Sequence, residues 1–312
     1  MSNWQAVVPE RFGTGESPFW HPVENTLYWV DIPGQRVLRA NVFMGTVESW
    51  PMPSEPGCIA PAQSGGLVIA LRDGVYRARS WGGPLAVLAR FNHDPRTTRF
   101  NDGKCDPLGR FWAGTIYEPR DARKGDLYSI DCRPDNGNGG KPQVALKAHN
   151  VVVANGLAWS ADARTLYWTD TTHHVIQAWD WEGGLNVLKH HRVFHQFPSK
   201  PKGWTADDAS GSAYGGRPDG AAVDAEGNYW VAMYEGARVL KLSPAGDVLA
   251  EIPVPVKCPT MPCFGGDDLR TLYLTTASHG RSGKELEAHP LSGRVLSMRV
   301  DVPGLPVNYF VD

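Results

Sequence analysis

Two stretches of the chain align residue for residue without a gap, and they decide the fold. Glu16-Ser-Pro-Phe-Trp-His-Pro-Val-Glu-Asn-Thr-Leu-Tyr-Trp-Val-Asp31 matches Asn155-Gly-Leu-Ala-Trp-Ser-Ala-Asp-Ala-Arg-Thr-Leu-Tyr-Trp-Thr-Asp170. Each contains two short runs rich in aromatic and β-branched residues on either side of a turn, which is the pattern of a β-hairpin. The self-similarity indicates a repeat architecture.

Further copies of the unit extend the repeat along the chain. Asn101–Trp112 aligns with Asp219–Trp230, and weaker copies begin at positions 58 and 261. The first positions are therefore 16, 58, 101, 155, 219 and 261, with spacings of 42, 43, 54, 64 and 42 residues. These spacings fit four short strands per unit plus two insertions. The sequence predicts an all-β, six-bladed β-propeller, whereas a pair of β-sandwiches would not produce this period.

The repeats also predict how the chain is organised at its two least regular places. We expect one propeller domain over residues 1–312, in which the stretch before Glu16, including Ala6–Pro9, supplies an outer strand that closes the last blade, since an open ring would leave strand edges exposed. The segment Pro198–Arg217 is rich in Gly, Ser and Asp and is expected to form a loop over one face of the ring.

Composition supports this fold and excludes several classes of function. Of 312 residues, 34 are glycine and 12 are tryptophan. Six tryptophans fall at two positions of the repeat, which predicts a role in packing the blades; they are Trp20, Trp29, Trp112, Trp159, Trp168 and Trp230. A net charge of −2 argues against a nucleic-acid partner. The chain has no apolar run of ~20 residues, which argues against a membrane partner.

The cysteines and the N-terminal residues indicate the cellular compartment. The chain has five cysteines and no C-x-x-C spacing, and it begins without a basic and then apolar signal segment. We therefore expect reduced thiols in a cytoplasmic protein that is a monomer or a weak homo-oligomer.

The first positions of the six units carry the chemistry. In a propeller the innermost strands all start at the same end of the central axis, so residues at equivalent first positions converge there. These residues are Glu16, Cys58, Asn101, Asn155, Asp219 and Met261. Converging carboxylates are costly unless a positive charge neutralises them. The ring therefore predicts a divalent cation held by two carboxylates and an amide oxygen, with positions left for water or substrate.

Four motifs in order resemble those of the gluconolactonase family, which includes senescence marker protein (regucalcin) and luciferin-regenerating-enzyme-like proteins. They are Gly15-Glu-Ser-Pro-Phe-Trp20, Arg99-Phe-Asn-Asp-Gly-Lys-Cys-Asp-Pro-Leu-Gly-Arg110, Ala154-Asn-Gly-Leu-Ala-Trp159, and Pro218-Asp-Gly220 followed by Asp224-Ala-Glu-Gly227. The resemblance implies a metal held by Glu16, Asn155 and Asp219, and sugar contacts from Arg99 and Asn101. Glu118 lies near an acidic substrate contact of some members, although Pro119 interrupts the register there.

The resemblance implies hydrolysis of a sugar aldonolactone to the aldonic acid. The metal would be calcium or zinc foremost, with magnesium, manganese and iron(II) as alternatives, since such an oxygen-ligand set discriminates poorly. Asp219 is then the catalytic base that accepts a proton from the attacking water. Two other functions stay open: a non-catalytic calcium-binding or regulatory propeller, and a metal-dependent esterase or phosphotriesterase for bulkier substrates. The pair Arg99 and Asn101 favours the lactonase.

Overall fold

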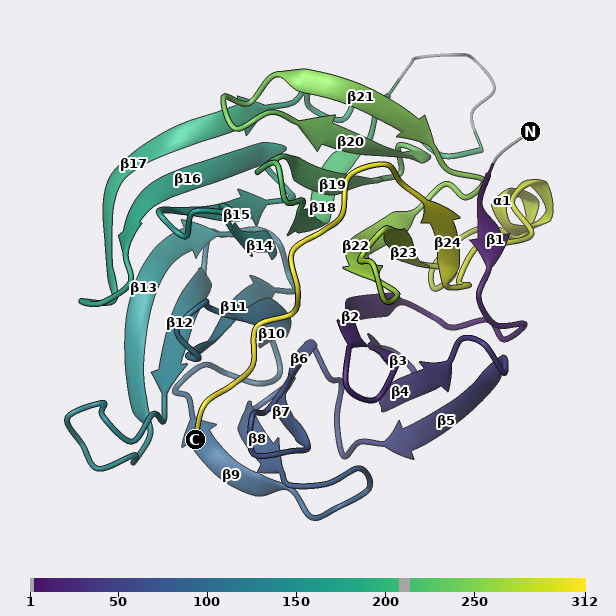
Figure 1. Cartoon of the computed structure of the whole chain (residues 1–312). Helices are drawn as coiled ribbons and strands as arrows, with labels where there is room; N and C mark the ends of the chain where they lie inside the picture. Colours follow the sequence, from purple (N-terminus) through teal and green to yellow (C-terminus); the bar gives the residue numbers. More distant parts are fainter. Residues whose placement is uncertain (1–2, 208–213) are drawn as a thin grey trace.

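Six four-stranded antiparallel sheets form a ring around a central axis (Figure 1). The structure is a computed structural model that describes residues 3–207 and 214–312. The predicted all-β, six-bladed propeller with four-stranded blades is therefore confirmed. The helix α1 (Gly283–Ala288) is the only one in the described parts of the chain, and it is far too short to cross a bilayer.

Each blade runs from an inner strand at the axis to an outer strand at the rim. The inner strands are β2 (Gly15–His21), β6 (Cys58–Pro61), β10 (Thr98–Cys105), β14 (Ala154–Trp159), β18 (Arg217–Val223) and β22 (Pro259–Gly265). The second strands are β3 (Thr26–Asp31), β7 (Leu67–Leu71), β11 (Phe111–Tyr117), β15 (Thr165–Asp170), β19 (Tyr229–Tyr234) and β23 (Thr271–Thr276). All six first positions of the sequence repeat lie in the inner strands.

The outer half of each blade completes the sheets. The third strands are β4 (Arg36–Asn41), β8 (Gly74–Ala78), β12 (Gly125–Asp131), β16 (Val175–Glu182), β20 (Arg238–Leu242) and β24 (Leu296–Arg299). The outermost strands are β5 (Thr46–Pro51), β9 (Ala86–Arg90), β13 (Gln143–Val151), β17 (Val187–Gln196), β21 (Val248–Pro253) and β1 (Gln5–Ala6).

The two ends of the chain meet in the last blade. β1 pairs antiparallel with β24, so the N-terminal strand covers the edge of a sheet built from the end of the chain. The strand ends at Ala6, short of the expected Ala6–Pro9. The loop between β17 and β18 contains the predicted insertion, of which residues 208–213 lie outside the described residues.

The last residues of the chain cross one end of the ring, a feature that the repeat does not predict. Figure 1 shows this segment, residues 300–312, running over the centre of the ring. Leu305 N–H donates to the carbonyl of Val223 at 3.1 Å, and Phe310 N–H donates to that of Pro61 at 2.8 Å. The segment ends in an ion pair between Asp312 and Arg77 at 2.9 Å. It therefore joins blades on opposite sides of the ring.

The repeated tryptophans pack within and between blades, as predicted. Trp29, Trp112 and Trp168 on the second strands are at most 1 % exposed. Their burial removes large apolar surfaces from water, which is the main stabilising contribution in an all-β fold of this size. The five cysteines are buried with free thiols.

A repeated aspartate turn holds two blades in register. In the turn after β10, Asp106 is fully buried and accepts hydrogen bonds from Leu108 N–H at 2.8 Å, Arg110 N–H at 3.1 Å and the Trp112 indole N–H at 2.8 Å. Asp224 repeats this arrangement after β18 and accepts from the Trp230 indole at 2.9 Å. The motif D-x-x-G thus links a hairpin turn to the tryptophan of the next strand.

Replacing Asp106 by Ala should lower the free energy of unfolding by about 2–4 kcal/mol, because the buried Arg110 N–H, Arg110 guanidinium and Trp112 indole would lose an acceptor. Urea denaturation measures the change. Asp268→Ala is the matched control, since Asp268 also sits in a hairpin turn but is exposed, and it should cost less than about 1 kcal/mol. Equal losses in the two variants would contradict this account of the turn.

Candidate metal centre

The inner strands are distorted at the positions that the sequence singled out. The antiparallel register shifts at this point in β2, β10, β14 and β18, between the pairs Glu16/Phe19, Phe100/Gly103, Asn155/Ala158 and Pro218/Ala221. β-Bulges of this kind redirect side chains and are common beside active sites. The bulges therefore turn Glu16, Asn155 and Asp219 out of the regular sheet pattern at one end of the axis.

The residues directly after Glu16 and Asn155 have an unusual backbone conformation. Ser17 and Gly156 have φ values of 49° and 58°, in the left-handed region. At Gly156 a Cβ atom would also lie 2.4 Å from the Tyr229 hydroxyl. A glycine is therefore required at position 156, directly after Asn155 in the bulge.

A chain of hydrogen bonds orients the two asparagines of the ring. The Asn101 side-chain amide donates to Asn155 Oδ1 at 2.9 Å and to the Ala154 carbonyl at 2.9 Å. The Asn155 amide donates to Thr171 Oγ1 at 2.8 Å, and Thr171 donates to the Pro218 carbonyl at 2.7 Å. The bond to Thr171 fixes which way the Asn155 amide faces. Asn155 Oδ1 has two lone pairs and accepts one hydrogen bond, from Asn101, so it keeps a lone pair for a cation. Sequence reasoning missed Thr171, which lies outside the aligned repeat.

Three buried carboxylates act on one another at this end of the axis. Glu16, Asp102 and Asp219 are 6 %, 3 % and 6 % exposed. Burial, reinforced by the charges of Asp219 and Asp102, raises the pKa of Glu16 well above its usual range. Burial also raises the pKa of Asp219 to about 8, although the nearby Arg217 charge opposes the shift. Unneutralised carboxylates at this depth favour protonation or a bound cation.

Asp102 adds a carboxylate that the sequence did not assign to the ring. Its Oδ2 accepts a hydrogen bond from Leu157 N–H at 2.9 Å, which links β10 to β14. Its Oδ1 is buried and has no hydrogen-bond partner among the described residues. Asp102 therefore ties the neighbouring blades together.

This donor set fits a hard divalent cation. Two carboxylates and an amide oxygen, from Glu16, Asp219 and Asn155, match the ligands that such ions take in proteins, and the orphaned oxygen of Asp102 adds negative charge beside them. Within residues 3–207 and 214–312, no group of three or more His, Cys, Asp or Glu side chains has metal-binding geometry. The predicted metal set combines two carboxylates with the Asn155 amide oxygen, and it stays a prediction.

The predicted sugar-contacting residues lie beside the ring. Arg99 donates to Asn101 Oδ1 at 2.9 Å and lies 3.3 Å from Glu118. Glu118 also pairs with Arg72 at 2.8 Å. Although burial opposes it, these arginines hold the pKa of Glu118 below its usual value. The structure thus brings Arg99, Asn101 and Glu118 together, with Glu118 anchoring two arginines, and Arg72 is a member that the sequence did not point to.

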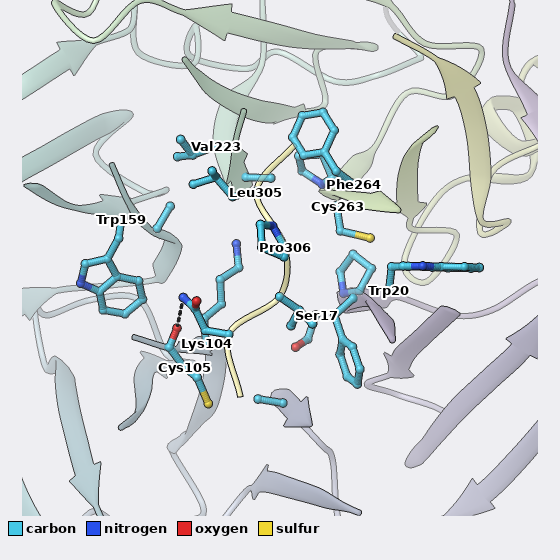
Figure 2. Close-up of a pocket in the computed structure, with 18 of the residues that line it drawn as sticks. Ser17, Trp20, Lys104, Cys105, Trp159, Val223, Cys263, Phe264, Leu305 and Pro306 are labelled. Atoms are coloured by element: carbon cyan, nitrogen blue, oxygen red, sulfur yellow. Dashed lines mark hydrogen bonds between the residues drawn. The ribbon is translucent and has the colours of Figure 1, made fainter. Parts of the chain in front are cut away.

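A separate apolar cavity lies at the opposite end of the axis. The cavity has a volume of about 310 Å³. Figure 2 shows Trp20, Trp159 and Phe264 in its walls and Leu305 of the C-terminal segment among its lining residues. Lys104 points into it and donates to the Ala221 carbonyl. None of Glu16, Asn101, Asn155 and Asp219 lines this cavity, so it is distinct from the candidate metal centre.

Comparison with known proteins identifies the family of this propeller. Residues 14–278 match the SMP-30/gluconolactonase/LRE-like region. The chain belongs to this family.

Individual relatives cover nearly the whole chain. A 6-deoxy-6-sulfogluconolactonase of Pseudomonas putida is 41% identical over 302 residues, which are 96% of each chain. Human regucalcin is 33% identical over 301 residues, 94% of this chain and 93% of its own. The crystal structure of a calcium-binding regucalcin from Agrobacterium tumefaciens superposes with a TM-score of 0.85 at 23% identity, covering 98% of this chain and 96% of that one.

Replacing Thr171 by Val should weaken divalent-metal binding roughly 10- to 100-fold, because the Asn155 amide loses the acceptor that orients it. Calorimetric titration of calcium and of zinc measures the change. Thr172→Val, one residue further along the same turn, is the control and should bind metal like the wild type. Unchanged affinity in Thr171→Val would show that Asn155 needs no such support.

The metal-free protein should become less stable as pH rises from about 4 to 8. The pKa of Asp219 is about 8 in the folded state against a reference value of 3.8, so the folded state binds the proton more tightly and loses that advantage as pH rises. Urea denaturation in the presence of a chelator measures the slope. Asp219→Asn should make it shallower. A free energy of unfolding that rises with pH across this window in the metal-free wild type would contradict the burial of these carboxylates.

Proposed function

We propose that the protein hydrolyses a sugar aldonolactone to the aldonic acid with one divalent metal ion. The observation that supports this most is the buried ring of Glu16, Asn155 and Asp219 at the axis, beside the pair Arg99 and Asn101. Family membership and the P. putida relative, which is named a sugar lactonase, agree with it.

The ring residues would have two roles, metal binding and proton transfer. Glu16, Asn155 and Asp219 would hold the ion, which would supply Lewis acidity toward the ester carbonyl and toward water. Asp219 offers the carboxylate that accepts a proton from the attacking water. Because Glu16, Asn155 and Asp219 are buried, their attraction to a cation is screened less than it would be in water.

Arg99 and Asn101 would position the sugar. The Arg99 guanidinium retains donor capacity beyond its contacts with Asn101, the Phe100 carbonyl and Glu118, and it can bind hydroxyls or the carboxylate of the product. Glu118 holds Arg99 in place and so supports the sugar contact. Gluconolactone and its 6-deoxy-6-sulfo derivative are the first substrates to test, the second because of the P. putida relative.

A calcium-binding role without catalysis is the second candidate. The similarity to proteins named regucalcin favours it. Calcium binding alone requires Glu16, Asn155, Asp219 and the support that Asn101 gives to Asn155. It does not require Arg99, so the presence of Arg99 beside Asn101 favours catalysis.

Asp219→Ala should abolish lactone hydrolysis, with a loss of at least about 1000-fold in kcat, because the variant removes both a metal ligand and the base. A pH-drop assay over gluconolactone, galactonolactone, xylonolactone, arabinonolactone and 6-deoxy-6-sulfogluconolactone, with each metal added back, measures it. Wild-type activity should also disappear with a chelator. Full activity of the variant in chelator would overturn the proposed mechanism, and failure of the wild type on every lactone would favour the calcium-binding role.

A further inference from the structure

A cluster of cations lies next to the metal centre, on the side of β18 and β19. Arg217 begins β18 two residues before Asp219, and its charge acts on the Asp219 carboxyl group. Lys200, from the loop before β18, and Arg281, from the loop before α1, reach the same place. All three cations approach the buried Glu235, at 2.9 Å for Lys200, 3.3 Å for Arg281 and 3.5 Å for Arg217.

Arg217 is the least neutralised member of this cluster. Glu235 is held closely by Lys200, and Arg281 pairs bidentately with Glu285. The guanidinium of Arg217 lies 5.1 Å from the centre of the Tyr234 ring, which fixes its plane. Its Nε is buried and has no hydrogen-bond partner in the described part of the chain. A buried guanidinium nitrogen without an acceptor indicates an anion-binding position.

Charge distinguishes this cluster from the other arginine cluster beside the ring. Arg99 and Arg72 are balanced by two carboxylates, Glu118 and Glu55. Around Glu235, three cations face the two carboxylates of Glu235 and Glu285. Arg217 also faces Asp219. A metal ion bound by Asp219 would neutralise that third carboxylate and leave one positive charge in excess in the cluster. A substrate group with a single negative charge would be neutralised here and not at Arg99.

We propose that Arg217, supported by Lys200 and Arg281, forms a subsite for a sulfonate on C6 of the aldonolactone, an assignment that rests on the proposed lactonase function. In a 1,5-lactone, C6 is attached to C5, which carries the ring oxygen of the scissile ester. The sulfur is therefore four bonds from the reacting carbonyl carbon, and its subsite must adjoin the metal ring. A sulfonate carries one negative charge, whereas a phosphate monoester carries about −1.5 to −2 at neutral pH, so the excess of one positive charge favours the sulfonate.

The experiment compares three lactones in wild-type protein loaded with metal: 6-deoxy-6-sulfogluconolactone, 6-phosphogluconolactone and gluconolactone. The sulfonated lactone should give the highest kcat/KM. Arg217→Met should lower the ratio of kcat/KM for the sulfonated lactone over gluconolactone roughly 10- to 100-fold, mostly through KM, because a charged hydrogen bond is lost. Arg217→Lys should fall between the two, since it keeps the charge and loses the planar fork.

Arg120→Met is the matched control, because Arg120 also acts on Asp219 but is exposed on the loop after β11. It should change the kcat/KM of all three lactones by a similar factor. Ethanesulfonate should compete with substrate in the wild type and lose potency in Arg217→Met, and thermal unfolding confirms that each variant is folded.

The outcomes separate the two proposals. Wild-type protein that hydrolyses gluconolactone and the sulfonated lactone with an unchanged ratio in Arg217→Met would overturn the subsite and leave the lactonase function standing. A preference for 6-phosphogluconolactone would overturn the assignment to a sulfonate. Wild-type protein that hydrolyses none of the three would overturn the lactonase function, and the subsite with it.

Discussion

The feature on which the site depends is the mutual repulsion of buried carboxylates at the axis of the ring. Glu16, Asp102 and Asp219 are withdrawn from water, and few hydrogen bonds from the chain offset that loss. The pKa of each is raised, with burial as the first cause. A bound divalent cation would neutralise these carboxylates and so relieve the electrostatic free energy that burial costs the metal-free fold. The protein should therefore bind the cation more tightly, and the bound cation should stabilise the fold.

The propeller can hold such a site because closure makes it rigid. Pairing of β1 with β24 completes the last sheet, and the C-terminal segment ties distant blades at the end opposite the metal centre. Inner strands from four blades then supply Glu16, Asn101, Asn155 and Asp219 from positions far apart in the sequence. A repeat architecture thus gathers residues that no local segment could bring together, and the bulges in these strands turn them toward the axis.

Much of this arrangement could be predicted from the sequence, since the repeat states where each inner strand begins. The alignment of Glu16 with Asn155 is enough to place both residues on inner strands. The contacts that hold the ring residues in place could not be predicted from the repeat. Thr171 and Arg72 lie in loops between the second and third strands of their blades, outside the aligned hairpins, and nothing in their spacing distinguishes them from turn residues. Asp102 was visible in its motif, but its link to Leu157 of the next blade depends on how blades pack. Arg217 is the last residue of the predicted insertion, Pro198–Arg217, in which the repeat pattern is lost.

Metal stoichiometry shows whether the axial ring holds one divalent ion. Calorimetric titration of calcium and of zinc into chelator-treated protein, repeated in two buffers of different ionisation enthalpy, gives both the number of ions and the protons released. We expect one ion per chain and loss of binding in Glu16→Gln. We also expect proton release at pH 7, because the pKa of Asp219 is about 8 without metal. Binding that persists at full strength in Glu16→Gln, or a wild-type protein that takes up no divalent ion, would contradict it.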